Sequence, residues 1–139
     1  MQGSIRSYSR PVLEAVKQKI TKIATSTAEA FDCKAEVNIT DLYPPTVNHK
    51  TETAHVIRVA AKYIGIEHIK SEELPVAGSE DFSYYLENRP GCFYFLGTNV
   101  VGNDYFCHTS KYDYNDSMIA TGALMFVGIV EDRLNAKIL

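Results

Sequence analysis

The segment Lys34-Ala35-Glu36-Val37-Asn38-Ile39-Thr40 alternates polar and apolar residues without a break. Successive side chains of a β-strand point to opposite faces, so this alternation is typical of a strand with one buried face and one hydrated face. We therefore predict a strand over 34–40, and with it a fold that contains a sheet.

A helix is predicted immediately before this strand, from about Pro11 to Phe31. Proline is tolerated in the first turn of a helix, and Ser9 stands at the capping position. Apolar residues recur at helical spacing along this segment, which predicts that one side of the helix is buried. These residues are Val12, Val16, Ile20, Ile23, Ala24 and Phe31.

A further short strand is predicted over Gly3–Tyr8, ahead of the helix. Strand, helix and strand together form half of a small open-faced α/β sandwich. Such a unit exposes a sheet edge, and an edge without an internal partner is commonly paired with another chain. We expect this part of the protein to form dimers.

The segment Tyr43–Asn48 separates this unit from the rest of the chain. Its consecutive prolines, Pro44 and Pro45, exclude a helix and disfavour a strand, so the segment is interpreted as a hinge. A second helix is predicted over Thr51–Ile64, with Gly65 as the residue that ends it.

Three elements are predicted in the remainder of the chain. A short helix begins near Ser79, and the mostly apolar segment Cys92–Gly97 is typical of a strand buried on both faces. The last helix runs from about Ser117 to Leu134, capped by Asn115 or Asp116. Its glycines suit close packing on a sheet, and they are Gly122 and Gly128.

Composition limits the classes of partner. Hydrophobic residues make up 45% and charged residues 22% of the chain, and the formal net charge is -3, which gives no basic surface for nucleic acid or for an anionic membrane. A small molecule or a protein is the expected partner. The three cysteines are too few and too scattered for a disulfide framework, and no targeting segment is visible. We expect a reducing compartment, the cytoplasm.

His108 is the candidate metal ligand. It lies in a loop after an apolar strand, close in sequence to Asp113 and Asp116, and side chains at strand ends often form metal sites in α/β proteins. The alternative is a loop histidine that bonds only to the backbone. One histidine cannot form a hydrolytic centre, because such a centre needs at least three protein ligands and an open position for water.

Glu80 and Asp81 stand at the start of the short helix. They are candidates for acid–base catalysis, although acidic side chains at this position also cap a helix and complement its dipole, which is the simpler interpretation. The exposed N–H groups of Gly78 and Ser79 are alternative binding groups for a substrate carboxylate.

Four sequence blocks together resemble a known family. They are Gly3-Ser4-Ile5-Arg6-Ser7, Tyr43-Pro44-Pro45-Thr46-Val47-Asn48, Gly78-Ser79-Glu80-Asp81-Phe82-Ser83, and His108 followed by Tyr112-Asp113 and Asn115-Asp116. In this order and at this spacing they resemble the metal-dependent amidohydrolases and carboxypeptidases of metallopeptidase family twenty. The likeness is to the branch of hippurate hydrolases, N-acyl-amino-acid amidohydrolases and auxin-conjugate amidohydrolases.

The resemblance implies a fold and a metal centre. Residues 1–42 resemble the second half of a small ferredoxin-like α+β lid that dimerises, and residues 43–139 resemble the final segment of an α/β metallohydrolase domain. In the family, two ions, zinc or manganese, bind a water that attacks an amide carbonyl. His108 matches the last metal ligand. The general base and the other ligands belong to upstream motifs, so no catalytic residue is expected in this chain.

The resemblance also implies substrate-binding residues. Arg6 matches a lid position that can grip a substrate carboxylate, with a surface arginine as the alternative, while Asn48 and the turn Gly78-Ser79-Glu80 face the cleft by analogy. The expected substrates are N-acyl amino acids or small peptides. We expect this fragment alone to be inactive and to bind metal weakly. The alternative is a non-catalytic truncated homologue that acts as a dimerisation or interaction module.

Overall fold

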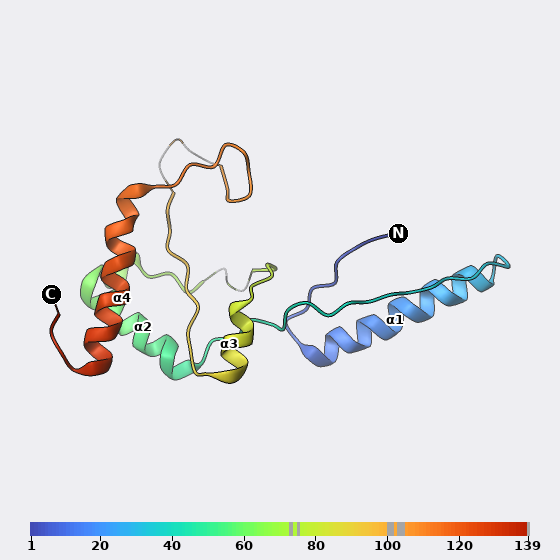
Figure 1. Cartoon of the computed structure of the whole chain (residues 1–139), viewed down its shortest axis with the longest axis horizontal. Coiled ribbons are helices and arrows are strands. Elements are labelled where there is room, and N and C mark those ends of the chain that lie inside the picture. The colour runs from blue at the N-terminus through green and yellow to red at the C-terminus, as the bar shows by residue number, and fades with distance from the viewer. Residues whose placement is uncertain (73, 75, 100–101, 103–104, 139) are drawn as a thin grey trace. The chain divides into compact units, whose positions relative to one another are not determined.

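A computed structural model of the 139-residue chain describes residues 1–72, 74, 76–99, 102 and 105–138. Its helices are α1 (Arg10–Glu29), α2 (Lys50–Tyr63), α3 (Phe82–Asn88) and α4 (Ile119–Leu134), with single 3₁₀ turns at η1 (Ile66–His68) and η2 (Asp116–Met118) (Figure 1). The chain forms two compact units, unit 1 (Met1–Val47 and Glu73–Pro90) and unit 2 (Asn48–Glu72 and Gly91–Leu139). Each unit is described by itself.

The helix predictions are confirmed. The predicted segments 11–31 and 51–64 form α1 and α2, and Gly65 follows the end of α2 with a φ of 92°, a conformation that glycine adopts readily. The predicted segment 117–134 forms η2 and α4, and the short helix expected near Ser79 begins at Phe82. Among the described residues, no helix is long and apolar enough to cross a membrane.

The core of unit 2 lies between α2 and α4. Val59 on α2 is 1% exposed and Met125 on α4 is 2% exposed, and Ala60 is buried beside them. Gly128 lets the two helices approach, because a Cβ atom there would lie 2.6 Å from the ring of Tyr63. The predicted close packing at Gly128 is therefore confirmed, but its partner is a helix and not a sheet.

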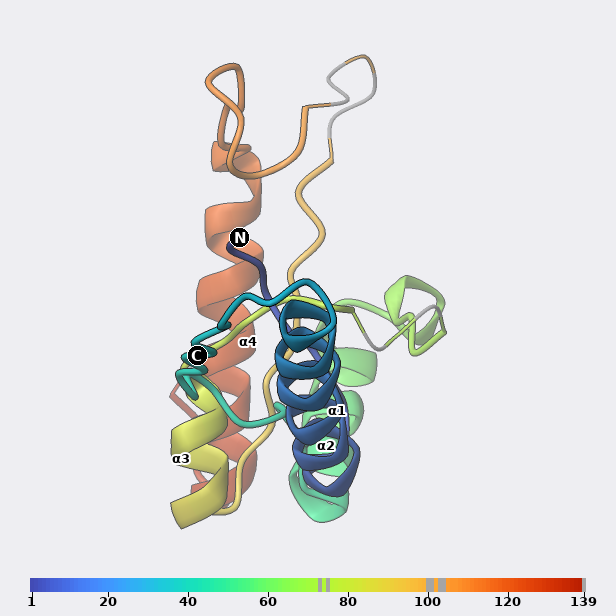
Figure 2. The same ribbon diagram turned by 90° about the vertical axis from the view of Figure 1, so that its right-hand side faces the viewer.

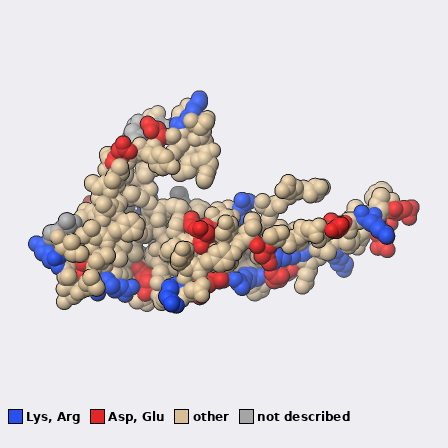
Figure 3. Space-filling view, in the orientation of Figure 1, with Lys and Arg blue, Asp and Glu red and all other residues tan. Residues whose placement is uncertain are grey.

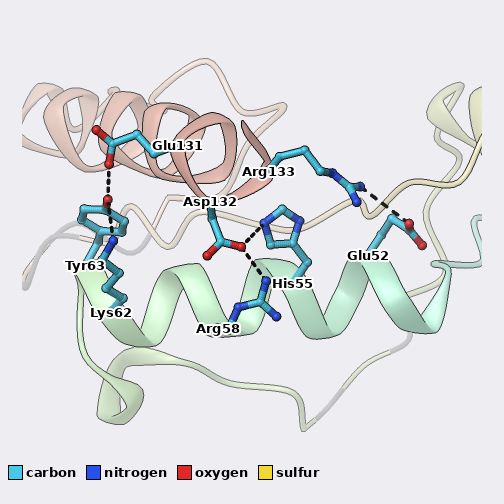
Figure 4. Close-up of polar contacts among 8 residues, drawn as sticks. All are labelled: Glu52, His55, Arg58, Lys62, Tyr63, Glu131, Asp132 and Arg133. Carbon is cyan, nitrogen blue, oxygen red and sulfur yellow. Dashed lines mark hydrogen bonds and ion pairs between the residues drawn. The ribbon is translucent and has the colours of Figure 1, made fainter. Parts of the chain in front are cut away.

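Polar side chains tie the same two helices together (Figure 4). Arg58 donates to Oδ2 of Asp132 at 2.5 Å, and this contact holds the pKa of the Asp132 carboxyl below its ordinary value. Nε2 of the buried His55 lies 2.8 Å from the same oxygen, without the alignment of a hydrogen bond. Tyr63 donates its hydroxyl to the buried Glu131. The interface between α2 and α4 thus combines an apolar centre with charged contacts.

Unit 1 has fewer buried side chains. α1 contacts α3 through Arg10 and Glu87, whose charged groups lie 2.5 Å apart, and Lys17 binds Asp41. The side chains of Ser83 and Leu86 on α3 are buried. Basic and acidic residues are interspersed on the face of the molecule shown in Figure 3. Unit 1 therefore combines a small buried part on α3 with polar contacts near its surface.

The predicted burial of one side of α1 is wrong for the described residues. α1 contains no buried residue, and Val12 is 54% and Ile23 65% exposed. Ile20 and Phe31 are also exposed, whereas Val16 and Ala24 are half-buried. The helical spacing was interpreted correctly, but no described element covers this side of the helix.

The predicted strands are not formed among the described residues. The segments 3–8, 34–40 and 92–97 carry no ladder of backbone hydrogen bonds, and the regular elements that the structure describes are helices. A strand needs a neighbouring strand to accept and donate these bonds, and the described part of the chain offers none of these segments such a neighbour. The predicted α/β class and its lid are therefore not confirmed, and the coarser family assignment is taken up below.

Candidate functional site

The loop that carries His108 lies in unit 2, at the N-terminal end of α4 (Figures 1 and 2). His108 is exposed, and its φ of 69° places it in the left-handed region. Few residues other than glycine adopt this conformation, although histidine does so more often than most. Such a conformation persists when its surroundings fix it, and it is frequent at functional sites.

Hydrogen bonds close a tight turn around His108. The hydroxyl of Thr109 donates to the carbonyl of Phe106 at 3.0 Å, and the amide of Tyr112 donates to the carbonyl of Thr109 at 3.2 Å. Cys107 and His108 lie between these contacts, with both side chains exposed. The turn thus presents the imidazole at the surface of unit 2.

Thr98 ties the loop to the preceding segment at two points. Its hydroxyl lies 3.1 Å from the hydroxyl of Tyr112, and its carbonyl accepts from Nδ2 of Asn115 at 3.4 Å. Oδ1 of Asn115 accepts from the amide of Ser117 at 3.2 Å, so Asn115 caps η2 as predicted. The residues that follow His108 are therefore fixed both to Thr98 and to the start of the last helix.

Aromatic side chains surround this turn. The rings of Tyr112 and Tyr114 lie 4.9 Å apart in an edge-to-face arrangement, and Lys111 lies over the ring of Tyr105 at 5.3 Å. Phe106 and Tyr114 are each 78% exposed. Exposed ring surface in the same loop as an exposed imidazole is suited to contact an organic ligand.

Asn48 and His49 bind the segment that leads to Thr98. The Asn48 side chain accepts from the amide of Phe93 and donates to its carbonyl, both at 2.7 Å. Nδ1 of His49 accepts from the amide of Gly91 at 3.2 Å, and the amide of His49 donates to the carbonyl of Gly91 at 3.1 Å. Both polar groups of the Asn48 amide are therefore used within unit 2.

The remaining candidate residues lie in unit 1. Oε1 of Glu80 accepts from the amide of Phe82 at 3.0 Å, and its carbonyl accepts from the buried hydroxyl of Ser83 at 2.7 Å. This contact at the first residue of α3 favours the capping interpretation of Glu80 over a catalytic one. Gly78, Ser79 and Arg6 are exposed.

The candidate residues are thus divided between the units, with Asn48 and His108 in unit 2. No hydrogen bond or ion pair joins two candidate side chains within the part of the chain that the structure describes. A search of the same residues finds no group of three His, Cys, Asp or Glu side chains that could hold a metal ion. His108 is one donor where a hydrolytic zinc needs at least three, so these residues do not fit a complete centre.

A comparison with protein families identifies this sequence pattern. The family described as peptidase family M20/M25/M40 matches residues 4–132. The chain belongs to this family. Its members are metal-dependent hydrolases, and the resemblance stated from the four sequence blocks is confirmed.

Individual relatives cover nearly the whole chain. Thermostable carboxypeptidase 1 of Saccharolobus solfataricus is 34% identical over 127 residues, and IAA-amino acid hydrolase ILR1-like 6 of Arabidopsis thaliana is 27% identical over 141 residues. N-acetyldiaminopimelate deacetylase of a Geobacillus strain is 28% identical over 130 residues. These matches cover 89%, 97% and 94% of this chain but only 31%, 30% and 33% of the relatives. The chain therefore spans about a third of the length of its relatives.

The residues that support the His108 loop could not be predicted from the sequence. Thr98 directly follows the apolar segment 92–97, and its two contacts reach residues 14 and 17 positions later. His49 stands in no local motif that indicates a partner, yet it binds Gly91 with its ring and its backbone. The available signal was a polar residue, Thr98, directly after the apolar segment, and this signal does not indicate which residues Thr98 contacts.

Proposed function

We propose that this chain is the C-terminal part of a metal-dependent amidohydrolase that cleaves the amide bond of N-acyl amino acids or small peptides. Family membership supports this proposal. So do the names of three relatives, which describe a carboxypeptidase, a hydrolase of an amino acid conjugate and a deacetylase. Hydrolysis of an amide bond at an amino acid is the reaction that unites these activities.

Within this chain, the proposal depends on His108 as the candidate metal ligand. An exposed imidazole in a turn fixed by Thr109, Tyr112 and Thr98 is suited to bind zinc or manganese, since ordered histidines are the most frequent ligands of such ions. Two such ions would polarise the amide carbonyl and supply the attacking hydroxide. The other ligands and the general base would come from outside this sequence, so the fragment alone should be inactive.

Substrate recognition is assigned to unit 1 and to Asn48. The exposed guanidinium of Arg6 would bind a substrate carboxylate with two parallel hydrogen bonds. The turn Gly78-Ser79-Glu80 would offer backbone amides to the same ligand, while the Glu80 carboxylate accepts from the amide of Phe82, the first residue of α3. Asn48 is kept in this set by its place in the family pattern, although its amide is bound to Phe93.

The domain organisation follows the same proposal. Residues 1–42 would form part of a ferredoxin-like lid through which two subunits associate, and residues 43–139 would form the last segment of the α/β catalytic domain. The strands predicted at 3–8, 34–40 and 92–97 would then pair with strands contributed by the rest of the enzyme. A reducing compartment such as the cytoplasm fits the three free cysteines.

The decisive experiment uses the protein from its complete natural reading frame and compares His108→Ala with His68→Ala. His68 is an exposed histidine in η1, so its removal controls for a general loss of imidazole. We measure bound zinc and manganese and the hydrolysis of N-benzoylglycine and N-acetyl amino acids. His108→Ala should lower kcat/KM by more than about 100-fold, because even the partners of metal ligands are worth 10–100-fold. Unchanged metal content and activity in this variant would exclude the assignment.

The exposed apolar side of α1 supports a second candidate, a non-catalytic interaction module. Large exposed apolar surfaces commonly bind other proteins, and Val12 and Ile23 are 54% and 65% exposed. The intact mass of the natural protein separates the two candidates. A much larger species that contains metal would support the hydrolase, and a species of about this length without metal would support the module.

A further inference from the structure

We propose that Asn48 and Thr98 are positioning residues that act on His108 through the segment 91–98. Asn48 sets the register of this segment at its start, and Thr98 holds the His108 loop at its end. All of these residues belong to unit 2. The inference deepens the proposed function, because it rests on His108 as the functional group.

The bonds of Asn48 and His49 fix the register of the segment 91–98, that is, which of its residues lie opposite them. In an antiparallel sheet, opposite residues can exchange two N–H to O=C hydrogen bonds, and the Asn48 side chain makes the same pair of bonds to Phe93, both at 2.7 Å. His49 makes two more bonds to Gly91, at 3.1 and 3.2 Å. A shift of the segment by one residue would break all four bonds. The side chain of Asn48 thus makes the two hydrogen bonds that a residue of a neighbouring strand would make.

Contacts with α4 keep the rest of the segment in the same register. Tyr94 packs against the core of α2 and α4, with its ring 6.4 Å from that of Phe126. Leu96, two residues later, lies against Gly122, where an added Cβ would be 3.3 Å from its methyl group. Alternate residues therefore face α4, as in an extended chain with a period of two. A displacement at Phe93 would move these contacts and Thr98 together.

Thr98 connects this segment to the His108 loop. The hydroxyl of Thr98 meets the hydroxyl of Tyr112, and its carbonyl accepts from Asn115. Tyr112 also closes the turn by donating its amide to Thr109, beside His108. The φ of 69° at His108 is a conformation that requires such support. Loss of either anchor should therefore release the backbone of His108 from this conformation and move the imidazole with it.

Three of the four histidines of this chain provide the test. His55 lies between α2 and α4 and reports the helix pair, His68 is exposed in η1, and His108 reports the loop. We compare Asn48→Leu, Thr98→Val and Thr98→Ser in the chain as it is, by NMR of the imidazole signals and by exchange of the Tyr112 amide hydrogen.

Asn48→Leu and Thr98→Val should each move the His108 ring signals and speed exchange of the Tyr112 amide by about tenfold, because local opening sets this rate. The His55 and His68 signals should stay in place. Thr98→Ser keeps the hydroxyl and should restore the wild-type His108 signals. This rescue would separate a specific contact from a general effect on packing.

Unchanged His108 signals and Tyr112 exchange in both Asn48→Leu and Thr98→Val would overturn the inference. Equal shifts at His55 and His108 would also overturn it, because they would indicate general destabilisation. If Asn48→Leu does not fold, the comparison of Thr98→Val with Thr98→Ser decides. The measurement involves no metal and no substrate, so it can fail while the His108→Ala test succeeds, and the reverse.

Discussion

α1 in unit 1 and the pair of α2 and α4 in unit 2 differ in what stabilises them. α1 is the longest helix, with 20 residues, yet it buries none of them, whereas α2 and α4, with 14 and 16 residues, each bury three. Local sequence can favour a helix of this length. Most of the stability of a helix in a folded protein, however, comes from packing its apolar side against other elements. The same helical spacing of apolar residues therefore has opposite energetic consequences in the two units.

Truncation of a buried side chain should show the difference in stabilisation between the two units most clearly. Met125→Ala should lower the free energy of unfolding by about 2–5 kcal/mol, because it removes a buried side chain and leaves a cavity. Met125 is 2% exposed. Urea unfolding followed by far-ultraviolet circular dichroism measures the change.

The matched variant is Ile23→Ala on α1, where the side chain is 65% exposed. A substitution at such a surface should change the unfolding free energy by less than about 0.5 kcal/mol. A loss at Ile23 as large as that at Met125 would mean that α1 is covered in solution, and the contrast between the units would not hold.

The next effect is expected at Gly128. Gly128→Ala should cost about 1–3 kcal/mol, because its Cβ would lie 2.6 Å from the ring of Tyr63 and 2.9 Å from Val59. Gly122→Ala is the control on the same helix, since its Cβ would meet only Leu96, at 3.3 Å. Its higher helix propensity should offset that contact. Equal losses in the two variants would argue against close approach of α2 and α4 at Gly128.

The charged contacts between α2 and α4 should make the stability of unit 2 depend on pH. The hydrogen bond from Arg58 lowers the pKa of Asp132 below 3.8. A carboxyl with a lowered pKa adds stability that is complete above its unfolded-state pKa and is lost as the pH falls through its folded-state pKa. The wild-type protein should therefore exceed Asp132→Asn in stability near neutral pH. This difference should shrink as the pH falls below the ordinary pKa of 3.8 and disappear once the pH has passed the lowered pKa of the folded state.

Urea unfolding at several pH values, from neutral to acidic, measures this difference. Arg58→Ala is the control, because it removes the main cause of the shift and should flatten the dependence. Identical pH profiles of the wild-type protein and Asp132→Asn would show that this carboxyl does not contribute.

A smaller effect than those at Met125 and Gly128 is expected at the polar contact within unit 1. Arg10→Ala removes the ion pair with Glu87, whose side chains are 66% and 42% exposed. Exposed pairs of this kind contribute about 0.2–1 kcal/mol and are weakened by salt. Thermal unfolding at low and high salt checks this value. A salt-independent loss would point to packing by the arginine stem instead of charge.

The helices could be predicted from sequence because their signals are local. Pro11 in the first turn of α1, Gly65 after α2 and Asn115 before η2 each mark a boundary by the chemistry of one residue. The strands could not be verified in the same way. The alternation over 34–40 describes which side chains a sheet would bury, but a ladder also needs a partner strand that this segment does not contain.

The candidate site shows the same limit. His108 was a candidate from its place after an apolar segment and from its match to a family pattern, but its left-handed backbone could not be inferred from either. The contacts of Asn48 with Phe93 and of Thr98 with Tyr112 join residues 45 and 14 positions apart. No periodicity or local motif encodes such pairs. A match to family sequences therefore located the candidate functional group but not the residues that contact its loop.

The division of the chain into units has a practical consequence for dissecting this protein. Each unit contains two separate stretches, so the backbone passes from one unit to the other after residues 47, 72 and 90. A single proteolytic cut cannot release either unit as one intact polypeptide. Unit 2 would have to be produced with residues 48–72 joined to residues 91–139 by an artificial linker, and such a linker must leave the bonds of Asn48 and His49 to Phe93 and Gly91 in place.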